Sequence, residues 1–166
     1  MARSPSQSVT RAWIRLMRAR ETVLGAIEQD LKAGGCPPLA WYDVLLELSR
    51  ARESRLRPFE IEKETLLAQY NLSRLLDRLE KEALIAREPC ADDARGQWVV
   101  ITEKGRATQA RTWKVYAKAI QKHVGEKLDD KAAEALGQLL GRLVLRFRSS
   151  PHIAARSMRA SETKEH

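Results

Sequence analysis

The segment that decides the fold is LSRLLDRLEKEALIAR, residues 72–87, followed shortly by DARGQWVVITEKGR, residues 93–106. In the first segment, apolar side chains recur at the three- and four-residue spacing of an amphipathic helix, which we predict over about residues 69–82. Its apolar side comprises Leu72, Leu75, Leu76, Leu79 and Ala83, and its polar side comprises Tyr70, Ser73, Arg74, Asp77, Arg78 and Lys81. One face is therefore predicted to pack on a core, and the other to remain available to a partner.

A β-hairpin is predicted directly after this helix. Residues 84–88 form a first short strand, and residues 97–101 form a returning strand rich in β-branched and aromatic residues. A charged tip, residues 92–96, joins them and contains a glycine, so the loop is longer than a two-residue turn. Thr102 is suited to cap a helix that starts after the hairpin.

Three helices are predicted on the amino-terminal side. A long amphipathic helix carries its apolar stripe from residue 13 to residue 31 and ends at the Gly- and Pro-rich residues 34–38. A second helix starts at Leu39 and fades over residues 50–57. A short third helix, residues 58–64, begins with a proline, which suits the first turn of a helix.

Two helices are predicted on the carboxy-terminal side. The first follows Thr102 and carries Trp113 and Tyr116. The second is capped by Asp129 or Asp130, has a leucine-rich face, and is closed by Pro151. The order of short helix, turn, amphipathic helix and hairpin predicts a winged helix-turn-helix, mainly α with a small β-hairpin wing.

Polar and cationic residues of the amphipathic helix and the hairpin tip are the predicted DNA contacts. A recognition helix needs one buried side so that the other can enter a major groove about 12 Å wide. Arginine can bridge two acceptors of guanine, and an arginine at a wing tip can reach a phosphate or the minor groove. The predicted set is Gln69, Tyr70, Asn71, Ser73, Arg74, Arg78 and Arg95.

The acidic residues among them are predicted to be structural. Asp77 is expected to orient a neighbouring arginine, because a carboxylate on this face would repel phosphate. Asp77 and Glu82 also stand four residues from Lys81 and Arg78, where surface pairs can form and weaken the case for Arg78. Asp93 is expected to shape the wing and orient Arg95.

The two quoted segments resemble the recognition helix, the wing and the start of the next helix in the MarR family of bacterial regulators. The combination of Asp-x-Arg at residues 93–95 with Ile-Thr-Glu-Lys-Gly-Arg at residues 101–106 is specific, and the resemblance covers about residues 61–106. It implies an obligate homodimer with intertwined terminal helices, and two winged domains that read a pseudo-palindromic operator. It further implies a transcriptional regulator, most simply a ligand-responsive repressor.

Four regions follow from this resemblance. Residues 1–36 are expected to form an amino-terminal dimerisation helix, and residues 37–104 the winged DNA-binding domain. Residues 105–150 are expected to form carboxy-terminal dimerisation helices, and residues 151–166 a flexible tail. Apolar stripes on both terminal segments, too long to be buried by a small winged core alone, support dimerisation.

The sequence departs from the family pattern at two positions. Ala68 stands where the family usually has Ser or Thr, so it cannot cap the recognition helix, at an expected cost of about 1 kcal/mol. Ala83 stands where the family usually has Gly, which indicates a turn that does not need a positive φ. Neither change removes a DNA contact.

Two kinds of effector remain open. Trp41 and Tyr42 lie near where this family often holds a small-molecule pocket, and with Trp13 they are predicted to bind a small aromatic acid. The same aromatic residues could equally fill the core. Cys36 and Cys90 offer the alternative of a thiol-based redox sensor, although neither has a clear cationic partner in the sequence.

Composition sets the remaining limits. The net charge is +8, yet residues 68–106 carry seven basic and seven acidic residues, so charge alone does not locate a DNA site. Two cysteines indicate a reducing compartment, which we take to be the cytoplasm, and no apolar run is long enough to cross a membrane. The arginine-rich first 20 residues also have the composition of a transit peptide, but their apolar period continues into the following helix.

No catalytic motif is present, and the three histidines have no ligand-spaced partners. The sequence therefore predicts neither an enzyme, nor a metal site, nor a cofactor. The main competing hypothesis is a protein-interaction module that keeps the winged fold without reading DNA, because fold alone does not decide function.

Overall fold

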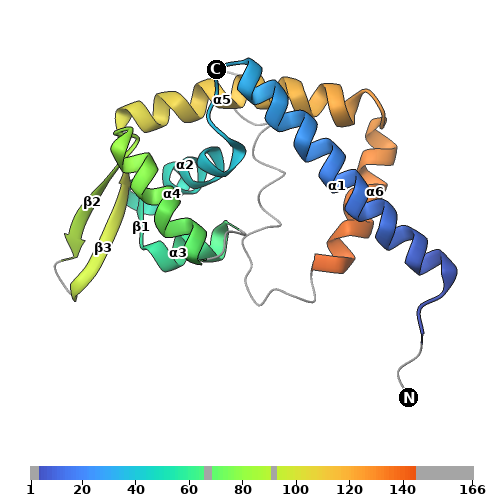
Figure 1. Cartoon of the computed structure of the whole chain (residues 1–166), viewed down its shortest axis with the longest axis horizontal. Helices are drawn as coiled ribbons and strands as arrows, with labels where there is room; N and C mark the ends of the chain where they lie inside the picture. Colours follow the sequence, from blue (N-terminus) through green and yellow to red (C-terminus); the bar gives the residue numbers. More distant parts are fainter. Residues whose placement is uncertain (1–3, 66–68, 91–92, 145–166) are drawn as a thin grey trace. The chain divides into compact units, whose positions relative to one another are not determined.

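The computed structural model describes residues 4–65, 69–90 and 93–144, and these fall into two compact units divided between residues 124 and 125. Helices dominate, and one small antiparallel sheet accompanies them (Figure 1). The elements are α1 (Gln7–Ala33), α2 (Leu39–Arg50), the 3-10 turn η1 (Arg52–Ser54), β1 (Arg55–Leu56), α3 (Pro58–Glu64), α4 (Gln69–Lys81), β2 (Ile85–Cys90), β3 (Asp93–Ile101), α5 (Glu103–Ile120), the π-turn η2 (Gln121–Gly125) and α6 (Asp130–Val144). The predicted fold class, a mainly α winged helix-turn-helix, is confirmed.

Local sequence signals explain where the helices begin. Pro58 occupies the first turn of α3, where its missing N–H costs nothing. The Thr102 hydroxyl accepts a hydrogen bond from the Gly105 N–H at 3.0 Å and caps α5, as predicted. Of the two aspartates considered for α6, Asp129 is the cap, because its carboxylate accepts from the Ala132 N–H at 2.8 Å.

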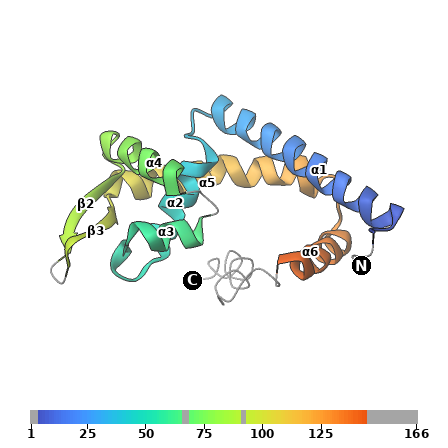
Figure 2. The ribbon, with the colours of Figure 1, turned by 60° about the horizontal axis from the view of Figure 1, so that its bottom comes forward.

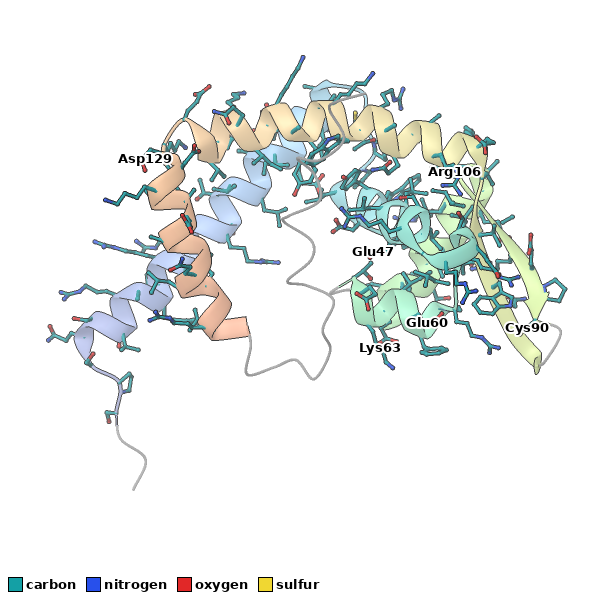
Figure 3. The ribbon with its side chains drawn as sticks, turned by 180° about the vertical axis from the view of Figure 1, so that it is seen from behind. Glu47, Glu60, Lys63, Cys90, Arg106 and Asp129 are labelled. Atoms are coloured by element: carbon teal, nitrogen blue, oxygen red, sulfur yellow. The ribbon has the colours of Figure 1, made fainter. Side chains whose placement is uncertain are left out.

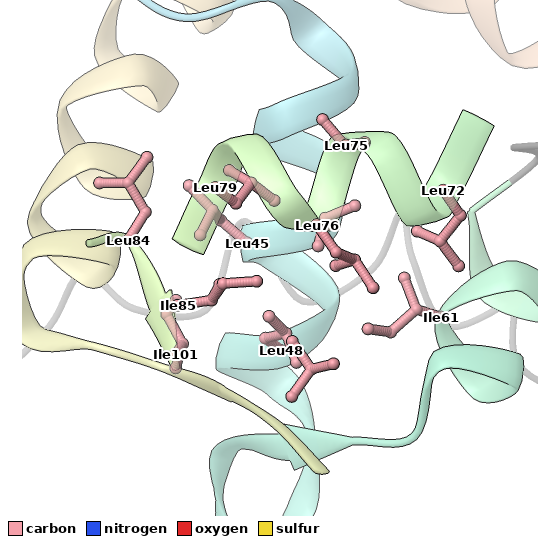
Figure 4. Packing of buried hydrophobic residues seen from close by; sticks show 12 residues of the cluster. Leu45, Leu48, Ile61, Leu72, Leu75, Leu76, Leu79, Leu84, Ile85 and Ile101 are labelled. Carbon is pink, nitrogen blue, oxygen red and sulfur yellow. The ribbon is translucent and has the colours of Figure 1, made fainter. Parts of the chain in front are cut away.

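The core of the winged domain forms where α4 packs on α2, α3 and the sheet (Figure 4). All four leucines predicted to face inward from α4 are buried: Leu72, Leu75, Leu76 and Leu79. They meet fully buried Leu45 and Leu48 of α2, Ile61 of α3, and Ile85 of β2. Burying a leucine side chain contributes about 1.5–3 kcal/mol, so this cluster fixes the orientation of α4.

The sheet has the order β1-β3-β2, with both pairs antiparallel. The hairpin pairs Ile85 with Ile101 and continues to Pro89 opposite Gln97, with a register shift at Cys90. Both strands are longer than predicted. The strand β1 was not predicted at all, since its two residues lie in a segment that we expected to be a fading helix, and two residues carry no detectable period.

The turn from α4 to β2 contradicts our interpretation of Ala83. This residue has a φ of +55° and is exposed, so it lies neither in an ordinary turn nor on the apolar side of the helix. The Leu84 N–H donates to the Leu79 carbonyl at 2.9 Å, and the Ala83 N–H donates to the Glu80 carbonyl at 2.8 Å. These two bonds are those of a Schellman motif, which places the residue after the cap in the left-handed region.

The terminal helices bury only part of their apolar surface. The carboxy-terminal half of α1 packs on α5, with Ile27, Leu31 and Ala119 buried (Figure 2). Further towards its start, α1 leaves Val9 and Trp13 exposed. In the second unit, α6 exposes three leucines: Leu136, Leu139 and Leu143. The predictions for Pro151 and for the tail lie outside the described residues.

Candidate nucleic-acid interface

The outer face of α4 is polar and open. With its leucines in the core, the helix exposes four of the predicted DNA contacts: Asn71, Ser73, Arg74 and Arg78. An α-helix with side chains is about 10–12 Å across, which matches a major groove about 12 Å wide. The structure therefore brings these four residues onto one surface that could face DNA. Gln69 and Tyr70 belong to the first turn of α4, but their side chains lie outside what the structure describes.

The two basic residues near the end of α4 are not held in the surface pairs that we expected. No hydrogen bond or ion pair joins Arg78 to Glu82, or Lys81 to Asp77, although all four residues are described. Asp77 is turned to another partner instead. Neither of these pairs holds Arg78 away from a phosphate or a base, so Arg78 stays in the predicted set.

The partner of Asp77 is Arg87, on strand β2. Arg87 Nη2 lies 2.6 Å from Asp77 Oδ1, and Arg87 Nη1 lies 2.7 Å from Glu80 Oε2. The single guanidinium therefore bridges two carboxylates one turn apart on α4. Asp77 does orient an arginine, as predicted, but that arginine lies ten residues away on the wing.

A second cationic contact ties the wing to the start of α3. The Arg57 guanidinium lies 5.0 Å from the centre of the Trp98 ring on β3, and Arg55 lies over the same ring at 4.7 Å. Arg57 Nη2 also donates to Cys90 Sγ at 2.9 Å, while the Arg57 backbone N–H donates to Glu60 at 2.7 Å. Figure 3 labels Glu60 on α3 and Cys90 on the wing. Arg57 thus connects the first helix of the helix-turn-helix to both wing strands.

Sequence reasoning missed this contact. The sequence shows no clear cationic partner for Cys90, because Arg57, which supplies one in the structure, lies 33 residues earlier. The only local signal in the sequence is a basic residue at the cap of α3, and this signal does not indicate that the residue contacts the thiol of Cys90. Cys36 lies in the loop between α1 and α2, half-buried, where its thiol is 3.7 Å from the Gly34 carbonyl.

The wing tip carries the remaining predicted contact. Arg95 belongs to β3, but its side chain and that of Asp93 lie outside what the structure describes. The predicted roles of these two residues, and the uncapped start expected at Ala68, therefore stay predictions.

The three aromatic residues predicted to bind a ligand have different environments. Trp13 is 60% exposed and makes no ring contact with another described aromatic residue. Trp41 is half-buried against the winged core. Tyr42 of α2 is 3% exposed and packs against α5. Within one chain, Trp13 and Tyr42 therefore do not form a common site.

Tyr42 instead belongs to an aromatic cluster that it forms with Trp113 and Tyr116 of α5. The Tyr42 ring stacks on Trp113 with 6.3 Å between centroids and meets the edge of Tyr116 at 5.4 Å. Burial raises the pKa of the Tyr42 hydroxyl above its usual value of 10, so the phenol stays protonated. Trp113 remains 40% exposed, so this cluster reaches the surface.

The described residues contain neither a cluster of metal ligands nor a helix that could span a membrane. Within residues 4–65, 69–90 and 93–144, no three His, Cys, Asp or Glu side chains gather as metal ligands. In the same ranges, no helix has the length and apolarity needed to cross a membrane.

The comparisons with known proteins agree with this architecture. The model of the MarR family matches residues 37–96, which confirms the predicted resemblance. No curated protein matches the sequence closely enough to count as a relative. Solved structures of MarR family transcriptional regulators share the fold.

Three such structures illustrate the similarity. Sco3205 from Streptomyces coelicolor, solved in complex with DNA, is 24% identical with a TM-score of 0.80, over 90% of this chain and 94% of that one. AbsC from the same organism is 23% identical with a TM-score of 0.78, over 90% and 100% of the two chains. BpsR from Bordetella bronchiseptica, whose DNA binding is described as regulated by 6-hydroxynicotinic acid, is 21% identical with a TM-score of 0.71, over 80% and 98%.

Proposed function

We propose that this chain, whose residues 37–96 match the model of the MarR family, is a sequence-specific DNA-binding transcriptional regulator that acts as a homodimer in the cytoplasm. The observation that carries the proposal is the two-sided nature of α4. Four leucines of this helix are buried in the core, while Asn71, Ser73, Arg74 and Arg78 are exposed on the other side. The DNA complex of the structurally similar Sco3205 supports the same use of the fold.

The homodimer follows from the exposed apolar surface of the terminal helices. Trp13 on α1 and three leucines on α6 would be covered in a dimer, and burial of this kind drives association. Two recognition helices in successive major grooves must lie about 34–36 Å apart, one DNA turn. We therefore propose that the operator is pseudo-palindromic, with half-sites at this spacing. We also propose that the dimer represses transcription when it occupies this operator.

We propose a small aromatic acid as the effector. BpsR is described as regulated by 6-hydroxynicotinic acid, which belongs to this chemical class. In this chain the aromatic cluster of Tyr42, Trp113 and Tyr116 lies between a helix of the winged domain and α5. A ligand there releases DNA only if it binds the DNA-incompetent arrangement more tightly. Trp41 and Trp13 remain predicted contacts.

A thiol-based response is the second candidate, favoured by one contact. Cys90 Sγ lies 2.9 Å from the Arg57 guanidinium, and Arg57 also holds Trp98 of the wing. Oxidation of this sulfur would alter its contact with Arg57 and, through it, the packing of the wing. Cys90 is only 7% exposed, however, which limits access to it. Loss of DNA binding on oxidation, abolished by Cys90→Ser, would favour this candidate over the aromatic acid.

The test of the proposed function is DNA binding by the full chain. Fluorescence anisotropy with the DNA upstream of its own gene, and with a scrambled duplex of equal length, should show tighter binding to the former. If the folded chain binds neither duplex, the alternative of a protein-interaction module replaces this proposal. Lys118→Ala, which removes an exposed charge from α5, is the control variant.

Two arginines should differ in what they contribute. Arg74→Ala removes a side chain that faces the major groove, so it should lose about 1–3 kcal/mol of discrimination between the two duplexes. Arg95→Ala should weaken binding to both duplexes alike, because wing contacts to phosphate carry little base information. Equal loss of specificity in both variants would overturn these assignments.

A further inference from the structure

Arg87 of β2 is a basic residue of the winged domain that contacts two carboxylates of α4. Its guanidinium contacts Asp77 at 2.6 Å and Glu80 at 2.7 Å, and its side chain is 25% exposed. Ile85, two residues earlier on the same face of β2, is buried in the core beneath α4. Arg87 therefore lies at the rim of the contact between the wing strand and the recognition helix.

The two carboxylates belong to the helix that would approach DNA. Asp77 is 61% exposed and lies one turn from Arg74 and Lys81, on the outer face of α4. A carboxylate there opposes phosphate and competes for the cations of its own helix. The Arg87 guanidinium offsets this charge from the side of the wing, and its planar fork engages both carboxylates at once.

We propose that Arg87 is a positioning residue of the DNA interface, which acts through Asp77 and Glu80 rather than by contacting DNA. It has two effects. It neutralises the carboxylates of the recognition helix, and it fastens β2 to α4, so that the wing and the helix meet one duplex together. The inference rests on the proposed DNA-binding function and deepens it.

Arg87→Met tests the proposal, since methionine keeps an apolar stem but has no charge. With a random-sequence duplex, we expect affinity to fall about tenfold, because Asp77 is left unneutralised beside the phosphates. Arg87→Lys should lose about threefold, since it keeps the charge but cannot form the fork. Lys118→Met controls for the loss of one positive charge at an exposed site.

The decisive variant is the double substitution Arg87→Met with Asp77→Asn, which restores the net charge of the wild type. A positioning residue that acts through Asp77 predicts that this double variant recovers most of the lost affinity. In the double variant, the dependence of log K on log salt should be that of the wild type. A direct phosphate contact would instead lower the slope by about 0.9, and Asp77→Asn would not rescue it.

The outcomes separate this proposal from the one on which it rests. If the wild type binds no duplex, both fail. If the wild type binds but Arg87→Met binds equally well, or if the slope falls without rescue, only the role of Arg87 is overturned. Thermal unfolding of each variant without DNA identifies any loss that arises from unfolding, which is expected to be small because both carboxylates are partly exposed.

Discussion

The winged core and the terminal helices use the same apolar residue types in opposite ways. In the core, Leu45, Leu48 and Leu79 are fully buried, and α2, α3, α4 and the sheet all contribute to one cluster. On the terminal helices, Trp13 and Leu139 remain 60% and 56% exposed. The leucines are alike, so the difference lies in whether the chain itself supplies a partner surface.

This difference shows which region buries its apolar surface within a single chain. The winged domain has a closed core and can orient α4 without help. The start of α1 and the face of α6 have apolar stripes that nothing in the described residues of their own units covers. Exposed stripes of this size mark interaction sites, and the proposed homodimer accounts for them.

Substitution of one leucine in each region tests the difference between the closed core and the exposed helices most directly. Leu45→Ala leaves a cavity in the closed core and should reduce the free energy of unfolding by about 2–5 kcal/mol. Leu139→Ala should barely change protomer folding, but should raise the dissociation constant of the dimer about tenfold or more. Urea unfolding at several protein concentrations, combined with sedimentation equilibrium, separates the two effects.

The contrary results for this pair are also distinct. A wild-type chain that sediments as a folded monomer at micromolar concentration would refute the homodimer. A loss in Leu139→Ala that is independent of protein concentration would mean that α6 is buried within its own protomer.

Two glycines provide a second test of the difference between the winged core and the terminal helices. A Cβ on Gly105 would lie 2.1 Å from the Leu84 carbonyl oxygen, because α5 starts directly against the turn between α4 and β2. Gly105→Ala should therefore cost about 1–3 kcal/mol or more. A Cβ on Gly25, in α1, would meet nothing within 4 Å, so Gly25→Ala should stabilise the helix by up to about 1 kcal/mol. Thermal unfolding of both variants measures the contrast, and equal shifts would contradict it.

The sequence predicted the elements with a strong period, and it failed where long-range contacts decide. The leucine spacing of α4, the returning strand and the Thr102 cap follow from local patterns, so they were predicted correctly. The contacts of Arg57 with Cys90 and of Arg87 with Asp77 depend on how the wing packs. No spacing along the chain encodes them.

The same limit applies to Ala83. An alanine at this position suggested an ordinary turn, yet tertiary structure imposes the left-handed conformation. The Thr102 hydroxyl donates to the Ala83 carbonyl at 2.8 Å, and the Thr102 N–H donates to the Leu84 carbonyl at 3.1 Å. These bonds fix the turn onto the start of α5, so the packing of the winged domain overrides the preference of one residue.

Ala83→Gly should therefore stabilise the protein. Left-handed geometry costs an L-residue about 1–2 kcal/mol, part of which returns as the greater freedom of glycine in the unfolded chain. A net gain of about 0.5–1 kcal/mol is expected, visible as a rise of about 1–4 °C in Tm. The same change at Ala86, the second residue of β2, which pairs with Val100 of β3, should destabilise instead, because glycine weakens a paired strand. A fall in Tm for Ala83→Gly would show that the turn does not keep its left-handed form in solution.

The smallest expected effect concerns the contact that holds the buried half of α1 to η2, directly after α5. Asp30 Oδ2 lies 2.8 Å from His123 Nε2, and Lys122 Nζ lies 3.1 Å from both carboxylate oxygens. The hydrogen bond from His123, followed by that from Lys122, lowers the pKa of Asp30 below its ordinary value of 3.8. Because the folded state favours the carboxylate, the stabilisation is complete above the pKa of Asp30 in the unfolded chain and is lost as the pH falls through its pKa in the folded protein.

Asp30→Asn should therefore flatten part of the decline in stability below about pH 4, whereas Glu21→Gln, which replaces an exposed carboxylate on the same helix, should not. Urea unfolding between neutral and acidic pH measures this, and an Asp30→Asn profile that parallels the wild type throughout would show that the contact adds nothing to the attachment of α1.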